Sequence, residues 1–215
     1  MVNGFFDRIA PQVSKCGVIP VFCPKSEAEL NTFLQALIPS PIRVVEITLR
    51  NELAIGALER IKKTDSSFIV GAGTVLSYDL LDAAAGAGAD FLVAPGYSPA
   101  LLNRAAQKGV PFLPGCATPS EIQNAMLDGY RTLKYFPAEC SGGTAALKLY
   151  QGAFAGVQFV PTGGITRKNL PEYLAQENVL ACGGSFMLPK EMLAANDSEG
   201  IYRMVMECLS IRGGK

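Results

Sequence analysis

Short apolar runs, rich in β-branched residues, alternate along this chain with longer segments in which apolar positions recur at helical spacing. The short runs are typical of strands buried on both faces, whereas the longer segments are typical of helices with one buried face. The pattern predicts strands at residues 17–22, 43–49, 68–71, 90–94, 110–113, 131–136, 157–161 and 179–183. It predicts helices at residues 3–14, 26–37, 51–62, 78–87, 99–107, 119–127, 144–150, 168–174 and 190–209.

Strands that alternate with helices at intervals of about 20–26 residues are typical of a (β/α)8 barrel. No linker or change in composition divides the chain. The sequence therefore predicts an α/β fold: a single-domain (β/α)8 TIM barrel over residues 1–215, with an extra N-terminal helix before the first strand. An open doubly wound sheet is the alternative, although such sheets usually have fewer strands.

Composition narrows the class of protein. Of 215 residues, 49% are hydrophobic and 18% are charged, which is typical of a globular protein rather than a disordered one. The 19 basic and 19 acidic side chains balance, so no basic excess indicates a nucleic-acid partner. We find neither an apolar run of about 18 residues nor a signal peptide, and therefore expect a cytoplasmic protein without a membrane partner.

The chain contains no histidine, which excludes nucleophile–histidine pairs and histidine-based zinc sites within it. Catalysis would have to use lysine, carboxylates, tyrosine, cysteine, backbone amides or a bound cofactor. None of the cysteines has the C-x-x-C spacing of zinc or redox motifs. We interpret all six as buried thiols in a reducing compartment: Cys16, Cys23, Cys116, Cys140, Cys182 and Cys208.

One predicted strand carries charged residues on a single face. Side chains alternate along a strand, so Glu46, Thr48 and Arg50 share one face and the apolar residues between them share the other. A carboxylate on the interior face of a barrel is costly unless it is compensated. Glu46 is therefore either paired with a strand arginine or part of an active site at the C-terminal ends of the strands.

Lys134 is the only one of the ten lysines that lies inside a clearly predicted strand. An amine in this position can attack a ketone and form a Schiff base. Glu46, on another interior strand, could then act as general acid and base. Alternatively, Lys134 simply pairs with an acid such as Glu46, or extends its amine to solvent at the barrel edge.

Two glycine turns follow the last two predicted strands, at residues 161–165 and 181–185. Backbone amides in such turns bind phosphate, and the loops after strands seven and eight are the usual phosphate site of barrels. Plain tight turns are the alternative. The glycine-rich segment 71–75 lacks the spacing of a nucleotide-binding motif, and we interpret its Thr74 as a site hydroxyl.

Seven segments together resemble a known family. The sequence is similar to the bacterial 2-keto-3-deoxy-6-phosphogluconate (KDPG) aldolases, also called 2-dehydro-3-deoxy-phosphogluconate/4-hydroxy-2-oxoglutarate (KHG) aldolases. The resemblance covers nearly the whole chain, in family order and spacing. The segments are VEITLR at 45–50, GAGTV at 71–75, APG at 94–96, PGCATPSE at 114–121, LKYFPAE at 133–139, PTGGI at 161–165 and CGGSFMLP at 182–189.

The resemblance implies a trimeric class I aldolase without metal or cofactor, acting on a small keto-acid phosphate. Such an enzyme cleaves KDPG to pyruvate and glyceraldehyde 3-phosphate, and 4-hydroxy-2-oxoglutarate to pyruvate and glyoxylate. It implies that Lys134 is the Schiff-base lysine and Glu46 the proton-transfer residue. The implied substrate ligands are Arg50 and Thr74 near the pyruvate carboxylate, Pro95 and Phe136 in the keto-acid pocket, and Gly163, Gly164, Gly184 and Ser185 at the phosphate. Thr162, beside the first glycine turn, is also expected to bind the substrate.

One departure from the family concerns the far end of the substrate. Many relatives carry an arginine directly after the first apolar run, where this chain has Cys23, with Lys25 two residues later. The substrate preference therefore stays open.

Two other functions remain as alternatives to an aldolase: a phosphosugar epimerase or isomerase barrel, and a non-catalytic barrel that binds a phosphosugar. Neither requires an imine on Lys134, so borohydride labelling with pyruvate distinguishes them from an aldolase.

Overall fold

The computed structural model describes residues 4–212, with side chains from residue 10 to residue 211. The apolar runs form parallel strands, and most of the predicted strands are confirmed with ends that shift by a few residues. The strands are β1 Val18–Phe22, β2 Val44–Thr48, β3 Ile69–Gly73, β4 Phe91–Val93, β5 Phe112–Leu113, β6 Gly115–Cys116, β7 Thr132–Tyr135, β8 Gln158–Pro161 and β9 Cys182–Gly184.

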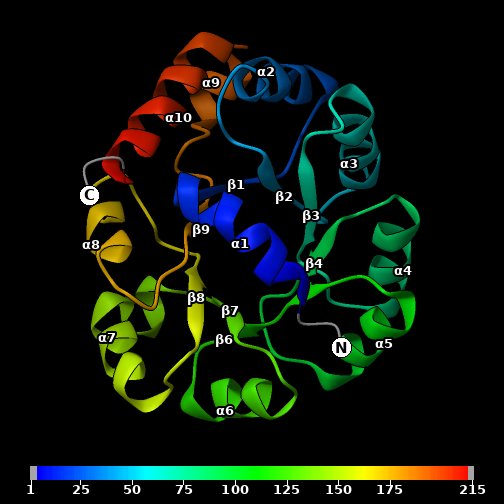
Figure 1. Ribbon diagram of the computed structural model, residues 1–215. Coiled ribbons are helices and arrows are strands. Elements are labelled where there is room, and N and C mark those ends of the chain that lie inside the picture. The colour runs from blue at the N-terminus through cyan, green and yellow to red at the C-terminus, as the bar shows by residue number, and fades with distance from the viewer. Residues whose placement is uncertain (1–3, 213–215) are drawn as a thin grey trace.

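Helices follow most of the strands and cover the outer side of the sheets (Figure 1). Ser26, Ser77, Ser98 and Thr118 begin four of them, and each side chain accepts the backbone N–H three residues on. The helices are α1 Gly4–Cys16, α2 Glu27–Leu37, α3 Leu53–Thr64, α4 Tyr78–Gly86, α5 Pro99–Lys108, α6 Pro119–Leu127, α7 Gly143–Ala153, α8 Leu170–Leu174, α9 Lys190–Ala194 and α10 Ser198–Arg212, with a short 3-10 helix, η1, at Glu139–Ser141.

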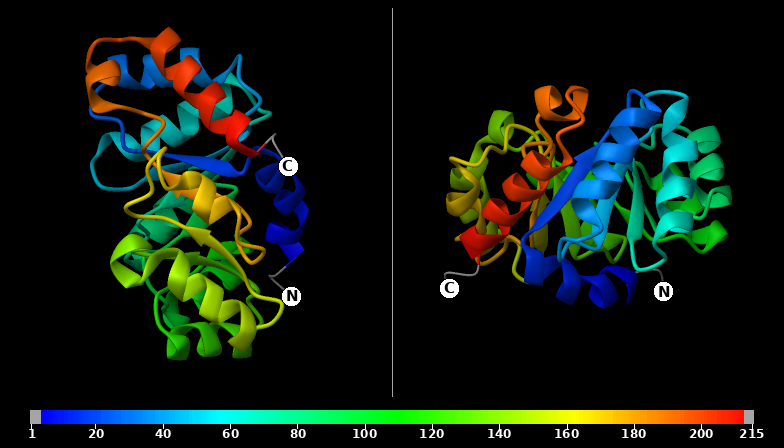
Figure 2. Two further views of the ribbon diagram at one scale, coloured as in Figure 1. Left: turned by 90° about the vertical axis from the view of Figure 1, so that its left-hand side faces the viewer. Right: turned by 90° about the horizontal axis from the view of Figure 1, so that it is seen from above.

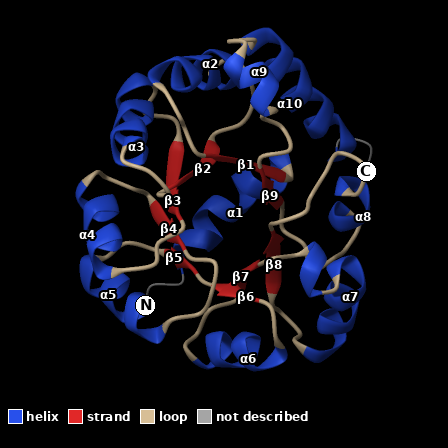
Figure 3. Ribbon diagram, turned by 180° about the vertical axis from the view of Figure 1, so that it is seen from behind, coloured by secondary structure: helices blue, strands red, loops and turns tan. Residues whose placement is uncertain are grey.

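The strands form two parallel sheets, in the orders β5-β4-β3-β2-β1-β9 and β6-β7-β8. Isolated bridges join Phe159 to Val179 and Thr162 to Gly183, so β8 lies beside the segment that leads into β9. At the other end, the chain passes from β5 to β6 through Pro114, whose carbonyl accepts a bond from the Lys134 N–H. Figure 3 shows the strands around a common centre with the helices outside them.

Two apolar clusters follow from the alternation of side chains along the strands. The larger lies between strands and helices and includes Val45, Ile47 and Leu49. The smaller includes Ile19, Val44, Phe91, Val93, Leu113 and Val160 on the opposite strand faces, together with Val13 of α1. Helix α1 therefore packs across one end of the strands, as Figures 1 and 2 show. Glu46 and Lys134 lie on the strand faces of this smaller cluster.

Three sequence predictions are wrong in detail. The single helix expected at 190–209 is two helices, because Asn196 takes a left-handed backbone conformation (φ 55°) between α9 and α10. The strand expected at 110–113 is reduced to β5, and β6 follows it without having been predicted. The last strand begins at Cys182 rather than Val179, which takes part only in the isolated bridge. Residue 3 of the first predicted helix lies outside the described residues.

Candidate active site

A buried ion pair joins the two charged residues predicted on interior strand faces. Lys134 of β7 donates from Nζ to Glu46 of β2, at 3.0 Å from Oε1 and 3.4 Å from Oε2. Their side chains are only 7% and 6% exposed. Burying an isolated charge would be very costly, so the pair is what makes both charges tolerable at this depth. The arrangement places an amine within proton-transfer distance of a carboxylate.

The Glu46 carboxylate lies against the backbone of β3 at Gly73. A Cβ atom at Gly73 would lie 2.1 Å from Glu46 Oε1 and 2.7 Å from its carboxyl carbon. No side chain fits into that distance. Gly73 of the GAGTV segment is therefore the residue that leaves room for the carboxylate.

Arg50 and Thr74 meet just beyond the ends of β2 and β3. The Arg50 Nε donates to Thr74 Oγ1 over 3.3 Å. Thr74 has φ 63°, a left-handed conformation that is uncommon for a β-branched residue. Such strain is retained at functional sites when the surrounding structure fixes it. The turn directs the threonine hydroxyl toward the guanidinium of the neighbouring strand.

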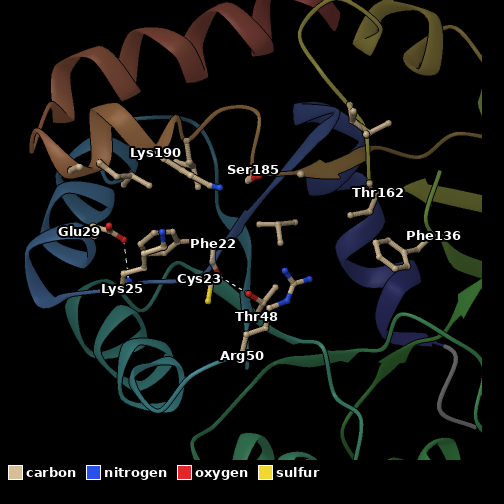
Figure 4. A pocket seen from close by; sticks show the side chains of 18 residues that line it. Phe22, Cys23, Lys25, Glu29, Thr48, Arg50, Phe136, Thr162, Ser185 and Lys190 are labelled. Carbon is tan, nitrogen blue, oxygen red and sulfur yellow. Dashed lines mark hydrogen bonds between the residues drawn. The ribbon is translucent and has the colours of Figure 1, made fainter. Parts of the chain in front are cut away.

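A cavity of about 710 Å³ opens beside these residues, between β1, β2, the β8 and β9 turns and α9 (Figure 4). The Lys134 Nζ lies 5.6 Å from the centre of the Phe136 ring, which is part of the cavity wall. The ion pair is therefore adjacent to the cavity. Of the residues predicted from the sequence, its wall includes Arg50, Phe136, Thr162, Gly163, Gly164, Gly184 and Ser185.

The two glycine turns come together at one side of this cavity. Gly163 and Gly164 have φ values of 95° and 81°, which favour glycine. A Cβ at Gly183 would lie 2.5 Å from Thr162 Oγ1, so the two turns pack without a side chain between them. This close packing makes the backbone of both turns part of one surface.

Four predicted residues are not among those that line the cavity within the described chain: Lys134, Glu46, Thr74 and Pro95. Lys134 lies close to the Phe136 ring in the wall, Glu46 is paired with Lys134, and Thr74 reaches the wall through Arg50. Pro95 is half-buried, and its carbonyl packs against Gly115, where a Cβ would lie 2.2 Å away. The structure therefore places Pro95 in the packing between β4 and β6.

The cavity also has a charged rim that the motifs did not predict. Lys25, before α2, and Lys190, at the start of α9, are exposed, and neither forms a salt bridge with a described residue. Figure 4 shows the Lys190 amine directed toward the Ser185 side of the cavity. Glu29 accepts a bond from the backbone N–H of Lys25. The one sequence signal for Lys190 is its position shortly after the second glycine turn.

The interpretation of all six cysteines as buried thiols is wrong. Cys116, Cys182 and Cys208 are buried, Cys16 and Cys23 are half-buried, and Cys140 is exposed because it lies in η1 at the surface. Burial raises the pKa of the Cys116 thiol to about 12, which disfavours the nucleophilic thiolate. Cys23 lines the cavity and accepts a bond from the Asn51 amide.

Within residues 4–212, which the structure describes, no group of three or more cysteine, aspartate or glutamate side chains could hold a metal ion, and the chain has no histidine. None of the helices in this part of the chain combines the length and apolar character needed to cross a membrane.

Comparison with known proteins places these residues in a family. The model of the KDPG and KHG aldolase family matches residues 9–204. The 2-dehydro-3-deoxy-phosphogluconate aldolase of Pseudomonas aeruginosa is 41% identical over 202 residues, 94% of this chain and 92% of that protein. The KHG/KDPG aldolase of Escherichia coli K12 is 39% identical over 198 residues, 92% of each chain.

Solved structures agree with the sequence comparison. The KDPG aldolase of Legionella pneumophila, with pyruvate captured at low pH as a covalent carbinolamine intermediate, superposes with a TM-score of 0.87. It is 36% identical, and the match covers 92% of this chain and 96% of that one. The KDPG aldolase of Zymomonas mobilis ZM4, solved with 3-phosphoglycerate, has a TM-score of 0.86 at 34% identity, covering 94% and 95% of the two chains. The chain belongs to the KDPG and KHG aldolase family.

Proposed function

We propose that this chain is a class I aldolase that cleaves KDPG to pyruvate and glyceraldehyde 3-phosphate, and 4-hydroxy-2-oxoglutarate to pyruvate and glyoxylate. The observation that carries the proposal is the buried Lys134–Glu46 pair beside a cavity with two glycine turns. The family relationship supports it, as does the relative that holds pyruvate as a covalent carbinolamine.

The reaction begins at Lys134. Glu46, 3.0 Å away, takes a proton from the ammonium, and the free amine attacks the C2 ketone of the substrate. Glu46 returns this proton to the hydroxyl of the carbinolamine, which leaves as water, so that an iminium ion and a free carboxylate remain. The carboxylate then removes the proton of the C4 hydroxyl, the C3–C4 bond breaks with its electrons passing to the iminium ion, and the aldehyde leaves an enamine behind. Protonation of the enamine at C3 and hydrolysis of the imine release pyruvate and restore the amine.

The other residues bind the two ends of the substrate. Arg50 and Thr74 hold the carboxylate of the keto acid by charge-assisted hydrogen bonds, and Phe136 packs against its carbon chain. Pro95 supports this end through the packing of β4. At the other end, the phosphate is bound by the two glycine turns and by the Ser185 hydroxyl. The turns contribute backbone amides from Thr162, Gly163, Gly164 and Gly184. Lys25 and Lys190 add positive charge at the rim.

We infer that the two sheets make one closed (β/α)8 barrel over a single domain, residues 1–215, with α1 as the extra N-terminal helix. The bridges between β8 and the segment leading into β9 support closure at one seam, and the Lys134 N–H bond to Pro114 supports it at the other. The family resemblance supports a homotrimer in the cytoplasm that acts on a small molecule.

The direct test is release of pyruvate by the purified protein from KDPG and from 4-hydroxy-2-oxoglutarate, followed by reduction of the pyruvate with lactate dehydrogenase. We expect cleavage of both substrates, unchanged by excess EDTA. Cleavage of neither substrate by a folded protein would overturn the proposal, and loss of activity in EDTA would overturn the metal-independent mechanism.

A further inference from the structure

Glu139 follows the Lys134 strand and contacts the first glycine turn. It begins η1, after β7, and its backbone N–H donates to Gly163 O over 3.1 Å. The N–H of Ala138 donates to Thr162 O over 2.9 Å. The segment that carries Lys134 is therefore bonded through its backbone to the turn proposed to bind phosphate.

The Glu139 side chain also occupies the space beneath this turn. A Cβ at Gly164 would lie 2.5 Å from Glu139 Cγ and 2.6 Å from its Cβ. Gly164 therefore needs to be glycine both for its positive φ and because the Glu139 side chain fills the adjacent space. A change in the position of this side chain would move the turn.

Tyr173 fixes the Glu139 carboxylate from the other side. It lies in α8, is completely buried, and donates from its hydroxyl to Glu139 Oε1. Burial, together with this hydrogen bond, raises the pKa of Tyr173, so the phenol stays a protonated donor at neutral pH. Asn169, one helical turn earlier, donates from Nδ2 to Gly164 O over 3.1 Å. Asn169, directly before α8, therefore holds the turn itself, and Tyr173 of α8 holds it through Glu139.

We propose that Glu139 and Tyr173 are positioning residues, which hold the Gly163–Gly164 turn at a fixed place relative to Lys134 and so align the phosphate with the reacting keto group. The inference rests on the proposed function. Neither residue has to touch the reacting atoms, because both act through the turn. Their contribution is therefore specific to substrates that carry a phosphate, since binding energy at a remote group serves to place the reacting centre.

The test compares kcat/KM for KDPG with kcat/KM for 4-hydroxy-2-oxoglutarate, which has no phosphate. Tyr173→Phe removes the donor and keeps the ring, and Glu139→Ala removes the acceptor and the support beneath Gly164. We expect each to lower the ratio of the two values about tenfold, the size of one lost hydrogen bond to a charged group. Glu139→Gln keeps the volume and an acceptor oxygen, so its ratio should stay within about twofold of wild type.

Tyr150→Phe is the matched control. This tyrosine donates to Ala117 O over 3.0 Å and packs against the rings of Tyr135 and Phe159, so it reports the general cost of losing a tyrosine hydroxyl. The ratio of the two kcat/KM values in Tyr150→Phe should equal the wild-type ratio. The rate at which pyruvate methyl protons exchange should be that of wild type in all of these variants. If Glu139→Ala does not fold, the ratios of Tyr173→Phe and Glu139→Gln test the positioning role without it.

An unchanged ratio in folded Tyr173→Phe overturns the positioning role, and so does an equal fall in Tyr150→Phe. Failure of the proposed function is distinct from this, because the wild-type protein would then cleave neither substrate. In that case the inference falls with the function on which it rests.

Discussion

Lys134 and Glu46 lie 88 positions apart in the sequence, yet Lys134 Nζ is 3.0 Å from Glu46 Oε1 inside the strands. The parallel sheets bring β2 and β7 to opposite sides of one interior, and each strand directs its single charged interior side chain toward the other. Because the pair is nearly inaccessible to solvent, its geometry is maintained by packing rather than by water.

Glu46→Gln removes the proton acceptor and keeps the side-chain volume. Cleavage should slow about 10²-fold or more, as expected for a lost general acid–base group. Borohydride should still trap pyruvate on Lys134, but more slowly, because Glu46 also accepts the proton of its ammonium. Exchange of the pyruvate methyl protons with deuterium, measured by NMR, should slow in parallel. Exchange at the wild-type rate in this variant would exclude Glu46 from moving protons at C3.

Gly73→Ala tests the space beside Glu46. The new Cβ would lie 2.1 Å from Glu46 Oε1, so the carboxylate must move away from its position beside Lys134. We expect kcat for KDPG to fall by about 10²-fold, because a misplacement of about 1 Å at a reacting centre can cost that much. Gly56→Ala, on α3 where nothing lies within 4 Å of the new Cβ, is the control and should keep wild-type activity. Full activity of Gly73→Ala would show that the carboxylate position is not critical.

Lys190→Gln tests the positive rim of the cavity. Loss of an unpaired ammonium should raise KM for KDPG about fivefold and leave KM for 4-hydroxy-2-oxoglutarate unchanged, since only the former carries a phosphate. The increase should shrink as salt is added. Lys148→Gln, an exposed position on α7, is the matched control. Equal effects on both substrates would remove Lys190 from phosphate binding.

Glu121 gives a prediction for stability against pH. Partial burial raises its pKa, but hydrogen bonds from the Ala117 N–H and from the hydroxyl and N–H of Thr118 outweigh that effect and leave the pKa below its usual value. The carboxylate therefore stabilises the start of α6 above the ordinary glutamate pKa of about 4.3, and this stabilisation is lost as the pH falls through the lower folded value.

Glu121→Gln should consequently lower the free energy of unfolding by about 1 kcal/mol at pH 7, in the range of other helix caps. The difference from wild type, measured by urea denaturation, should shrink as the pH is lowered below about 4.3. A difference that stays constant between pH 7 and pH 3 would assign the effect to packing instead.

The interior-facing charges could be predicted because strand alternation is a strong local rule. Glu46, Thr48 and Arg50 share a face whatever the rest of the chain does, and Lys134 is the one lysine in a predicted strand. The ion pair itself depends on how the two sheets are placed relative to each other, which no local pattern encodes.

The details that the sequence did not predict depend on single residues. Asn196 breaks the last helix through its left-handed backbone, and its side chain accepts a bond from Thr32 of α2. Asp197 then accepts the Gly200 N–H at the start of α10. Such turns override an apolar period that continues through them. Lys190 lies in no motif, and only the packing of α9 beside the β9 turn brings it to the cavity.

Borohydride trapping with pyruvate, followed by peptide mass analysis, tests directly whether Lys134 is the nucleophile. We predict one adduct, on the peptide that contains Lys134, and neither an adduct nor aldol cleavage in Lys134→Arg, because a guanidinium stays protonated and cannot form the imine. An adduct on another lysine, or cleavage at the wild-type rate by folded Lys134→Arg, would contradict the assignment of Lys134 as the nucleophile.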